Sequence, residues 1–328
     1  MTTISASTIL RSRNASQPDK VLSTLLLRYP RFIHAEFMTH RVFSRNAASS
    51  RAIPVKKLIQ DVIDNPVIPL HWGKNQPGMQ AHEECDAPLN VSDTIWGESG
   101  NYPFKRDEAW LLAMAAAVDM ARAFSDAGYH KQVVNRLLEP FAHITVLVSS
   151  TEWDNFLELR DHEDAEPHIR MLAQEIRKCI ERKDDIQTLR PGQWHLPFVE
   201  DEAADHWMDV YGGGQGYIGD DLKKAQQSCL SDMIKLSVAR CASTSYKTVD
   251  GFDMTIERAV QLHDKLVAAR PIHASPAEHV AQADRWDTGE FGGGIVGLNE
   301  TGWATPEEHG NFIGFRQYRK KLELGNSL

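Results

Sequence analysis

The chain has 328 residues, of which 42% are hydrophobic and 25% charged, so it has the composition of an ordinary globular protein with one large or two small domains. Its formal net charge of -9 excludes general nucleic-acid binding through a basic surface. The four cysteines form no Cys-x-x-Cys pair and no apolar run is long enough to span a membrane. We therefore expect reduced thiols, no membrane association and a cytoplasmic location.

The first elements are predicted from turn and proline signals. Ile4–Arg11 and Val21–Tyr29 are β-prone runs separated by a turn-forming segment, which predicts a hairpin. Pro30 suits the first position of a helix. The residues of this helix that we expect to face inward are Ile33, Phe37 and Met38.

The middle of the chain is mostly helical in pattern. Pro54 opens an amphipathic helix, and the stretch rich in Pro, Gly, Asn and Trp at 66–103 indicates an ordered insertion or a long loop. Arg106–Asp126 predicts a strong helix, and His130–Glu139 predicts a second one that Pro140 stops.

A short strand and two helices follow. His143–Val148 predicts the strand, Thr151–Arg160 a short helix with Thr151 and Asp154 as a capping box, and Ala165–Arg182 a longer helix. Together these patterns predict an α+β fold with an antiparallel sheet flanked by several helices and mostly helical mass.

The last third has two glycine-rich segments, 212–219 and 292–297. Neither has the Lys-Ser/Thr ending of a phosphate-binding loop, so flexible loops are the favoured interpretation. Helices are predicted for Asp221–Arg240 and Phe252–Ala269. A capping box at Ser275–Glu278 would place His279 in the first turn of another helix, and a basic helix is expected near Asn311–Leu324.

Glu36–Arg51 is the most informative run of the chain. It gathers three arginines, His40, four hydroxyl side chains and an amide, a set that suits phosphates and planar heteroaromatic rings. A solvated basic helix face is the ordinary alternative. The spacing of Thr39-His40-Arg41, Ser49 and Arg51 resembles the signature of the flavin-dependent thymidylate synthases, the ThyX family.

Further segments resemble the same family. Arg136–Pro140 resembles a helix end whose arginine reaches the nucleotide, and Asn155–Arg160 resembles the family's Asn-Phe-Leu-x-Leu-Arg. Ala242–Tyr246 is similar to its Ala-Arg-x-Ser-Tyr, and His273–His279 to its His-x-Ser-Pro-Phe-Glu-His. In the family this last segment precedes the arginine-rich signature, whereas here it follows. We interpret this order as a circular permutation, or as the rearranged order of a divergent branch of the family.

The resemblance implies a single catalytic domain over residues 1–328, with insertions at about 66–103 and 190–219. It implies reductive methylation of dUMP at C5, with FAD as cofactor, methylenetetrahydrofolate and NADPH as co-substrates, and no cysteine nucleophile. It also implies a homotetramer whose subunits share active sites.

The resemblance also assigns roles to single residues. Arg160 would be catalytic, stabilising negative charge on the pyrimidine electrostatically, because an arginine does not give up its proton. The residues expected to bind dUMP are Glu36, Ser49, Ser50, Arg51, Arg136 and Arg160. The residues expected to line FAD are Thr39, His40, Arg41, Asn46, Asn155, Ser245 and His279.

Departures from the family pattern leave the substrate open. Thr39 replaces the first arginine of Arg-His-Arg, Glu36 a usual glutamine and Ala47 a usual glutamate. A related flavin and folate enzyme with another C5-modified product, such as a hydroxymethylated pyrimidine, or with a cytosine substrate therefore stays an alternative. A non-catalytic flavin- or nucleotide-binding protein is another. No metal site is expected, because the adjacent ligand types in 82–86 rarely converge on one ion.

Overall fold

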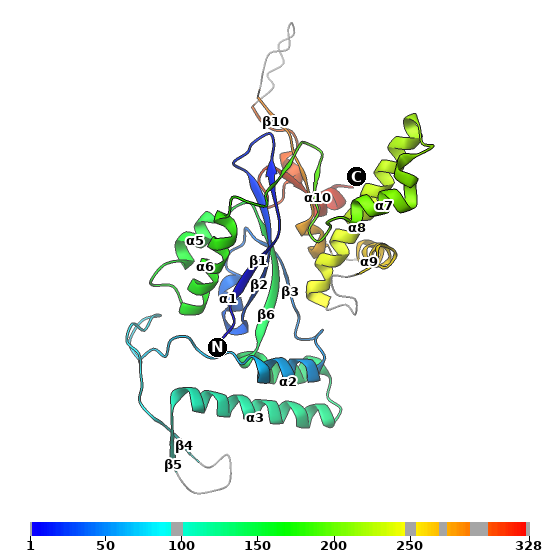
Figure 1. Cartoon of the computed structure of the whole chain (residues 1–328). Coiled ribbons are helices and arrows are strands. Elements are labelled where there is room, and N and C mark those ends of the chain that lie inside the picture. Colours follow the sequence, from blue (N-terminus) through cyan, green and yellow to red (C-terminus); the bar gives the residue numbers. More distant parts are fainter. Residues whose placement is uncertain (1, 93–100, 247–253, 269–273, 289–300, 326–328) are drawn as a thin grey trace.

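The protein is described here by a computed structural model of residues 2–92, 101–246, 254–268, 274–288 and 301–325. Figure 1 shows a central sheet with helices on both of its faces and across one end. Within these residues no helix is both long enough and apolar enough to cross a bilayer. The α+β fold with an antiparallel sheet flanked by helices, as predicted, is confirmed.

The central sheet has five strands in the order β3-β6-β2-β1-β7. They are β1 (Ser5–Asn14), β2 (Val21–Pro30), β3 (Ser44–Ala47), β6 (His143–Ser150) and β7 (Gln187–Leu189). The predicted hairpin is β1 and β2, which pair antiparallel. β6 lies between β2 and β3 and is antiparallel to both, whereas β7 pairs parallel to β1 at the edge.

One face of the sheet carries the main hydrophobic core. Because side chains alternate along a strand, Leu25, Leu27 and Tyr29 of β2 share this face with Val146 and Val148 of β6. The helices α5 (Asp154–Arg160) and α6 (Pro167–Glu181) cover it. The aromatic and aliphatic residues that they bury there are Phe156, Leu157, Ile169, Leu172 and Ile176. α5 is thereby held with its last residue beside α1 (His34–Phe37).

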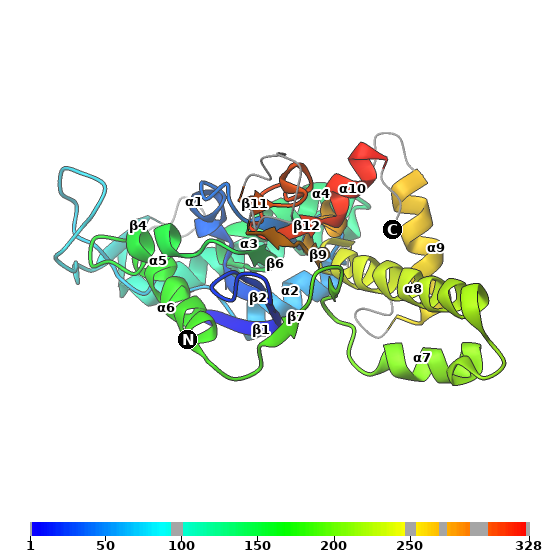
Figure 2. The ribbon, with the colours of Figure 1, turned by 90° about the horizontal axis from the view of Figure 1, so that it is seen from above.

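The opposite face of the sheet carries hydroxyl side chains and is covered by the C-terminal half of the chain. After α6 the chain passes round the sheet edge through β7, then enters β8 (Trp194–His195) on the other side. β8 belongs to a second sheet, of order β12-β9-β8, with β9 (Ala281–Ala283) and β12 (Phe315–Gln317). Figure 2 shows α6 and α8 on opposite sides of β1 and β2.

The helices of the C-terminal half pack beside this second sheet. They are α7 (Glu202–Tyr211), α8 (Gly219–Tyr246), α9 (Ile256–Ala268) and α10 (Tyr318–Leu324), with the 3-10 helices η4 (Gly212–Gly214), η5 (Ser275–His279) and η6 (Pro306–Glu308). A two-stranded ribbon of β10 (Trp286–Asp287) and β11 (Gly302–Trp303) lies near η6. The glycine-rich segment 212–219 joins α7 to α8, and the segment 292–297 lies outside the described residues.

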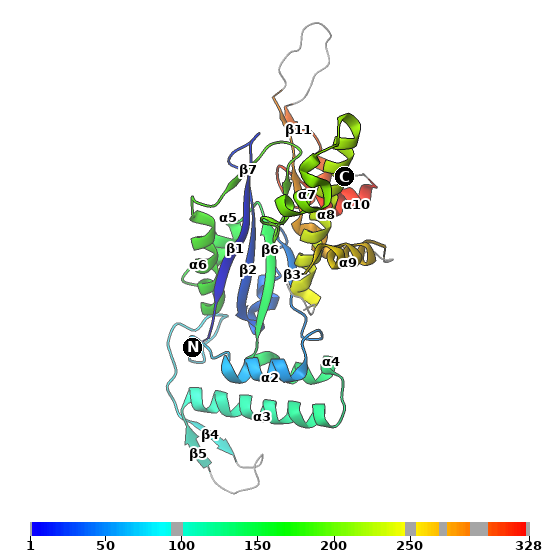
Figure 3. The same ribbon diagram turned by 45° about the vertical axis from the view of Figure 1, so that its right-hand side comes forward.

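A third group of helices closes one end of the sheet. α2 (Val55–Asp64) and α3 (Arg106–Asp126) lie side by side there (Figures 1 and 3). They share a hydrophobic cluster with α4 (Lys131–Val134) and the 3-10 helix η3 (Asn135–Phe141). In the predicted insertion at 66–103, the described residues are largely irregular, and β4 (Leu89–Ser92) pairs antiparallel with β5 (Asn101–Phe104).

Some predicted helix boundaries were wrong. Pro140 does not stop a helix, because the chain there is already in the 3-10 helix η3, which continues through it. Thr151 does not cap α5, since its hydroxyl accepts a hydrogen bond from the backbone N–H of Ile313 at 2.9 Å instead. Ser275 makes no side-chain cap, and His279 ends η5 rather than beginning an α-helix.

Two further expectations about these helices were wrong. The segment after Pro30 is split into the 3-10 helix η1 (Arg31–Ile33) and α1, and Met38 is 42% exposed rather than buried. The C-terminal helix begins at Tyr318, after strand β12, rather than near Asn311, and its Lys321 is buried beside Glu308.

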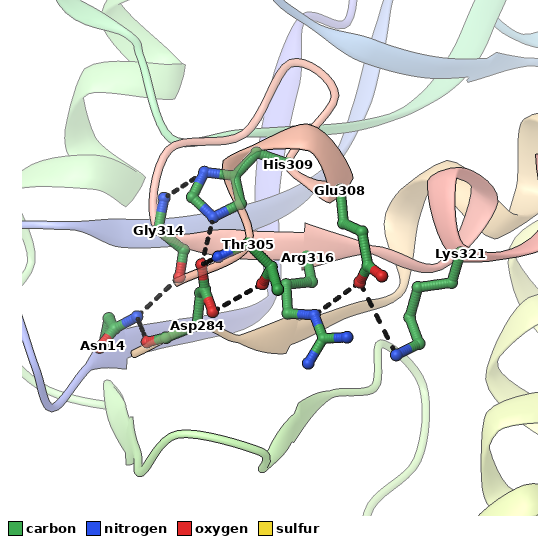
Figure 4. A network of polar contacts seen from close by, with 8 residues as sticks. All are labelled: Asn14, Asp284, Thr305, Glu308, His309, Gly314, Arg316 and Lys321. Atoms are coloured by element: carbon green, nitrogen blue, oxygen red, sulfur yellow. Dashed lines mark hydrogen bonds and ion pairs between the residues drawn. The ribbon is translucent and has the colours of Figure 1, made fainter. Parts of the chain in front are cut away.

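A buried polar network ties the C-terminal segment to the β1–β2 turn (Figure 4). Asp284 accepts hydrogen bonds from His309 Nε2 at 2.9 Å and from the backbone N–H and the hydroxyl of Thr305 at 2.9 and 2.8 Å. Asn14 donates to the carbonyls of Asp284 and Gly314. The network therefore fixes β9 and β12 against the tip of the central sheet.

Candidate active site

Arg160, the last residue of α5, is surrounded by polar groups from α1 and the residues after it. Its Nε–H donates to Nε2 of His40 at 3.0 Å, and its Nη1 donates to the carboxylate of Glu36. Its Nη2 lies 3.5 Å from the hydroxyl of Thr39. Four residues predicted for the site from the sequence, Glu36, Thr39, His40 and Arg160, are thus brought together.

His40 is a neutral acceptor in this group. Burial, and after it the positive charges of Arg160 and Arg45, lower the pKa of His40 to about 4. Its ring lies edge-on to Phe156, with 4.8 Å between ring centroids, and stacks beside Phe43. The neutral ring can therefore accept the Arg160 Nε–H at physiological pH, and aromatic packing fixes its orientation.

A cavity of about 840 Å³ lies beside this group. Glu36, Thr39 and Arg160 line it from one side. Residues 79–82 of the insertion and residues 162–167 after α5 line the rest. The side-chain amide of Gln80 donates to the carbonyl of Asp164, which holds the two walls together. The insertion is therefore part of the cavity wall. The volume of the cavity is in the range of small-molecule sites.

Glu36 holds Arg160 at this cavity, and this predicts a graded mutational response. Glu36→Ala is expected to lower kcat/KM about tenfold, because the guanidinium loses the acceptor that orients it. Glu36→Gln keeps an amide oxygen that can accept the same hydrogen bond and should retain most of the activity. Steady-state kinetics of the two variants check this, and equal losses would contradict the orienting role.

The residues predicted to bind phosphate form a separate group near the end of β3. Ser50 Oγ and Arg136 Nη1 both donate to the carboxylate of Glu139, at 2.8 and 2.9 Å, and Arg31 pairs with the same carboxylate at 3.1 Å. Arg51 is exposed, and its backbone N–H donates to Ser49 Oγ at 3.3 Å. Glu139 thus gathers Ser50, Arg136 and Arg31, whereas Arg51 and Ser49 have no hydrogen bond to it.

Asn46 and His279 lie on the opposite face of the sheet from Arg160. Asn46 alternates with Arg45 and Ala47 along β3, and its amide donates to the carbonyl of Cys241 in α8 at 3.4 Å. His279 Nδ1 is 2.9 Å from Ser149 Oγ of β6. Asn46 therefore lies beneath α8, and His279, the last residue of η5, faces β6. Neither residue lines the cavity.

Two buried polar atoms on this face lack a hydrogen-bond partner, His279 Nε2 and Thr244 Oγ1. Burying a polar group without a partner costs about 1–3 kcal/mol, and a polar ligand that contacts these atoms would recover that cost. The carbonyls and ring nitrogens of a flavin would supply one, and these residues fit that cofactor. Arg41 and Asn155 are exposed, and the side chain of Ser245 lies outside the described residues.

Several polar residues of these groups were not found from the sequence. Glu139 lies three residues after Arg136, a spacing that could have indicated the ion pair. His195, which contacts Ser12 and Thr24, lies in the segment interpreted as an addition. The sequence did contain one indication of this contact. Hydroxyl residues of β1, β2 and β6 occupy the strand positions that face away from the hydrophobic core, where a polar partner could be expected.

The described residues also bear on metal and thiol chemistry. Among them no group of three or more His, Cys, Asp or Glu side chains could hold a metal ion. Each of the four cysteines is free, and burial raises the pKa of the Cys241 thiol far above its ordinary value. A thiolate nucleophile at Cys241 is therefore disfavoured.

Comparison with known proteins gives a match to a protein family and matches to solved structures, but none to a curated protein sequence. The fold is similar to two structures of a UMP/dUMP methylase, PolB from Streptomyces cacaoi, bound with 5-Br UMP (TM-score 0.39, 13% identity) and with 5-Br dUMP (TM-score 0.36, 14% identity). These cover 57% of this chain and 91% and 92% of theirs. No curated protein sequence matches. The family described as "Thymidylate synthase complementing protein" matches residues 5–184 of the 328, and the chain belongs to this family, the flavin-dependent thymidylate synthases that its motifs resemble.

Proposed function

We propose that this protein catalyses the reductive methylation of dUMP at C5, using methylenetetrahydrofolate and NADPH with FAD as cofactor. The observation that carries the proposal is the guanidinium of Arg160, held by Glu36 and His40 at the wall of the 840 Å³ cavity. A fixed cation beside a cavity can stabilise negative charge that develops on a bound pyrimidine. Such charge makes C5 a better carbon nucleophile.

The other residues bind and orient. Arg51 and Arg136, with Ser49 and Ser50, are proposed to hold the nucleotide phosphate. The phosphate would replace Glu139 as the acceptor for Ser50 and Arg136. Bound FAD, once reduced by NADPH, would pass the electrons on for the reduction. The residues proposed to hold it are Thr39, His40, Arg41, Asn46, Asn155, Ser245 and His279.

The separation of these residues in one chain supports an assembly with shared sites. Arg160 and His40 lie on the α5 side of the sheet, whereas Asn46 and His279 lie on the α8 side. In the part of the chain that the structure describes, no hydrogen bond or ion pair joins the two groups. In a homotetramer, the group with Arg160 of one subunit could face the group with His279 of a neighbouring subunit. Each site would then be complete, as we expect from the family.

The circular permutation is also part of the proposal. The family match ends at residue 184, just after α6, and the segments that resemble the family's beginning lie in α8 and η5. The chain passes round the sheet edge through β7, and the addition at 190–219 follows directly, beginning with β8 on the other side. We therefore treat the whole chain as one cytoplasmic catalytic domain, with 66–103 and 190–219 inserted.

A second candidate is a related flavin and folate enzyme that makes another C5-modified pyrimidine nucleotide. The Glu36 carboxylate in the cavity favours it, because a carboxylate accepts hydrogen bonds and cytosine presents an amino donor where uracil presents a carbonyl. Mass spectrometry of the product formed from dUMP and from dCMP separates the two candidates.

The visible absorption spectrum of the purified protein with FAD, before and after dUMP is added, tests the proposal. We expect a perturbed flavin band that changes again with dUMP, because both ligands occupy one site. A flavin band that responds to dCMP but not to dUMP would favour the second candidate. A spectrum equal to that of free FAD would contradict both.

A further inference from the structure

A line of buried polar side chains crosses the hydroxyl face of the sheet and ends at His279. We call it the hydroxyl relay, and its members in order are Gln187, Ser12, His195, Thr24, Ser149 and His279. The five successive donor–acceptor distances are 2.8, 2.6, 2.8, 2.6 and 2.9 Å. All members except Gln187 have no exposed surface.

Strand register builds the relay. Ser12 of β1 lies opposite Gln187 of β7, and Thr24 of β2 lies opposite Ser149 of β6. His195 of β8 lies between the two pairs and contacts one hydroxyl with each ring nitrogen. The relay therefore runs across four adjacent strands, from the exposed edge of the sheet to η5.

The hydrogen-bonding capacity of each group fixes the first proton positions. Gln187 contributes its amide nitrogen, which can only donate, so the Ser12 hydroxyl accepts from it. The Ser12 proton then has one remaining partner, Nδ1 of His195, and must be donated to it. Burial, with a smaller contribution from His279, lowers the pKa of His195 to about 3, so the ring is neutral and carries its single proton on Nε2.

The same reasoning continues to the end of the relay. His195 Nε2–H donates to Thr24, whose hydroxyl then donates to Ser149. Ser149 in turn donates to Nδ1 of His279. Burial lowers the pKa of His279 to about 3, so this ring is also neutral. Its proton is left on Nε2, the atom that has no partner in the structure.

We propose that the hydroxyl relay fixes His279 as an Nε2–H donor and that the acceptor it meets is a carbonyl or ring nitrogen of the bound flavin. The flavin part rests on the proposed function, whereas the tautomer rests on the relay alone. His195 and Gln187 are then positioning residues, because they act on the cofactor through His279. A buried N–H group that lacks an acceptor is costly. By fixing the proton on Nε2, the relay therefore favours a ligand that presents an acceptor to His279.

The tautomer of His279 is measured first, by two-dimensional NMR of the FAD-free full-length protein labelled with ¹⁵N-histidine. The expected result is a protonated Nε2 and an unprotonated Nδ1, for His279 and for His195. His279→Gln identifies the His279 signals. A His279 that carries its proton on Nδ1 would overturn the proposal, whatever the reaction of the enzyme.

Gln187→Glu tests the direction of the relay. The carboxylate can only accept, so the Ser12 hydroxyl should turn towards it and every later proton should reverse. We expect His279 to become the Nδ1–H tautomer and FAD to bind about tenfold more weakly, since Nε2 then faces the flavin as an acceptor. Gln187 is exposed, so the variant should fold.

Thr188→Glu is the matched control, because it places the same charge at the next exposed position of β7, outside the relay. It should keep the wild-type tautomer and FAD affinity. If the tautomer of His279 were unchanged in Gln187→Glu as well, the relay would be overturned.

Titrating the wild type with FAD should shift the His279 Nε2–H resonance, while a shift with dUMP alone would overturn the flavin assignment. Failure of the wild type to bind FAD would contradict the proposed function. The tautomer of His279 in the FAD-free protein would still test the relay in that case.

Discussion

Replacing Arg160 by alanine is expected to lower kcat about 10²- to 10³-fold while FAD binding persists. The guanidinium is held at the cavity by Glu36 and His40, so its charge is in place before the reaction begins. Removing one such fixed donor from an active site typically costs this much, because no water molecule provides an equally oriented charge. Turnover of dUMP and the flavin absorption spectrum measure the two quantities separately.

Arg160→Lys and Arg177→Ala are the informative companions to this variant. Lysine keeps the charge but not the planar fork that reaches Glu36 and His40 together, so it should recover only part of the activity. Arg177 of α6 pairs with Asp161 at 2.7 Å and does not line the cavity, so its alanine variant should keep near wild-type kcat. Turnover by Arg160→Ala at the wild-type rate would remove Arg160 from the mechanism.

The elements that the sequence predicted well are those with local signals. The β1–β2 hairpin follows from two alternating strands and a turn, and α3 begins and ends where predicted. The η3 segment was missed because the interpretation of Pro140 as a stop assumed an α-helix, whereas the chain forms a 3-10 helix there. The helix expected from Asn311 was shortened because 315–317 pairs as a strand with β9, a partner distant in sequence.

The candidate site shows the same difference. Local motifs indicated single residues of the site, but not the contacts between residues that are distant in sequence. The motif Asn155–Arg160 indicates an arginine with a role, but not that Glu36 and His40, more than a hundred residues earlier, would hold it. Likewise, nothing local to His195 indicates that it bridges hydroxyls of two strands. Such contacts depend on strand order and register, which arise only when the whole sheet is assembled.

Asp284→Ala is expected to have the largest effect on stability, about 3–5 kcal/mol in the free energy of unfolding. Asp284 is 3% exposed and accepts hydrogen bonds from His309 and from two groups of Thr305 (Figure 4). Alanine leaves these buried donors without an acceptor, and breaking a buried pair from one side costs about this much. Chemical denaturation followed by circular dichroism measures the change.

The same carboxylate should give the wild type a stability that depends on acid. Burial alone would raise the pKa of Asp284, but the hydrogen bonds from His309 and Thr305 outweigh it and lower the pKa to about 2, against about 3.9 in an unfolded chain. Because the folded pKa is depressed, this contribution of about 2–3 kcal/mol is fully present above pH 4 and is lost as the pH falls towards 2. Asp284→Asn should therefore lose part of the acid sensitivity together with the stability.

Asp287→Asn is the control for the acid dependence. Asp287 lies three residues away on β10, is partly exposed and pairs with Arg285 at 2.7 Å, an exposed ion pair of the kind that contributes at most about 1 kcal/mol. Its variant should unfold near the wild-type denaturant midpoint and keep the wild-type loss of stability between pH 4 and pH 2. If Asp284→Asn retained that same loss, other carboxylates would account for the acid sensitivity, and the network in Figure 4 would not be what fixes the C-terminal segment to the sheet.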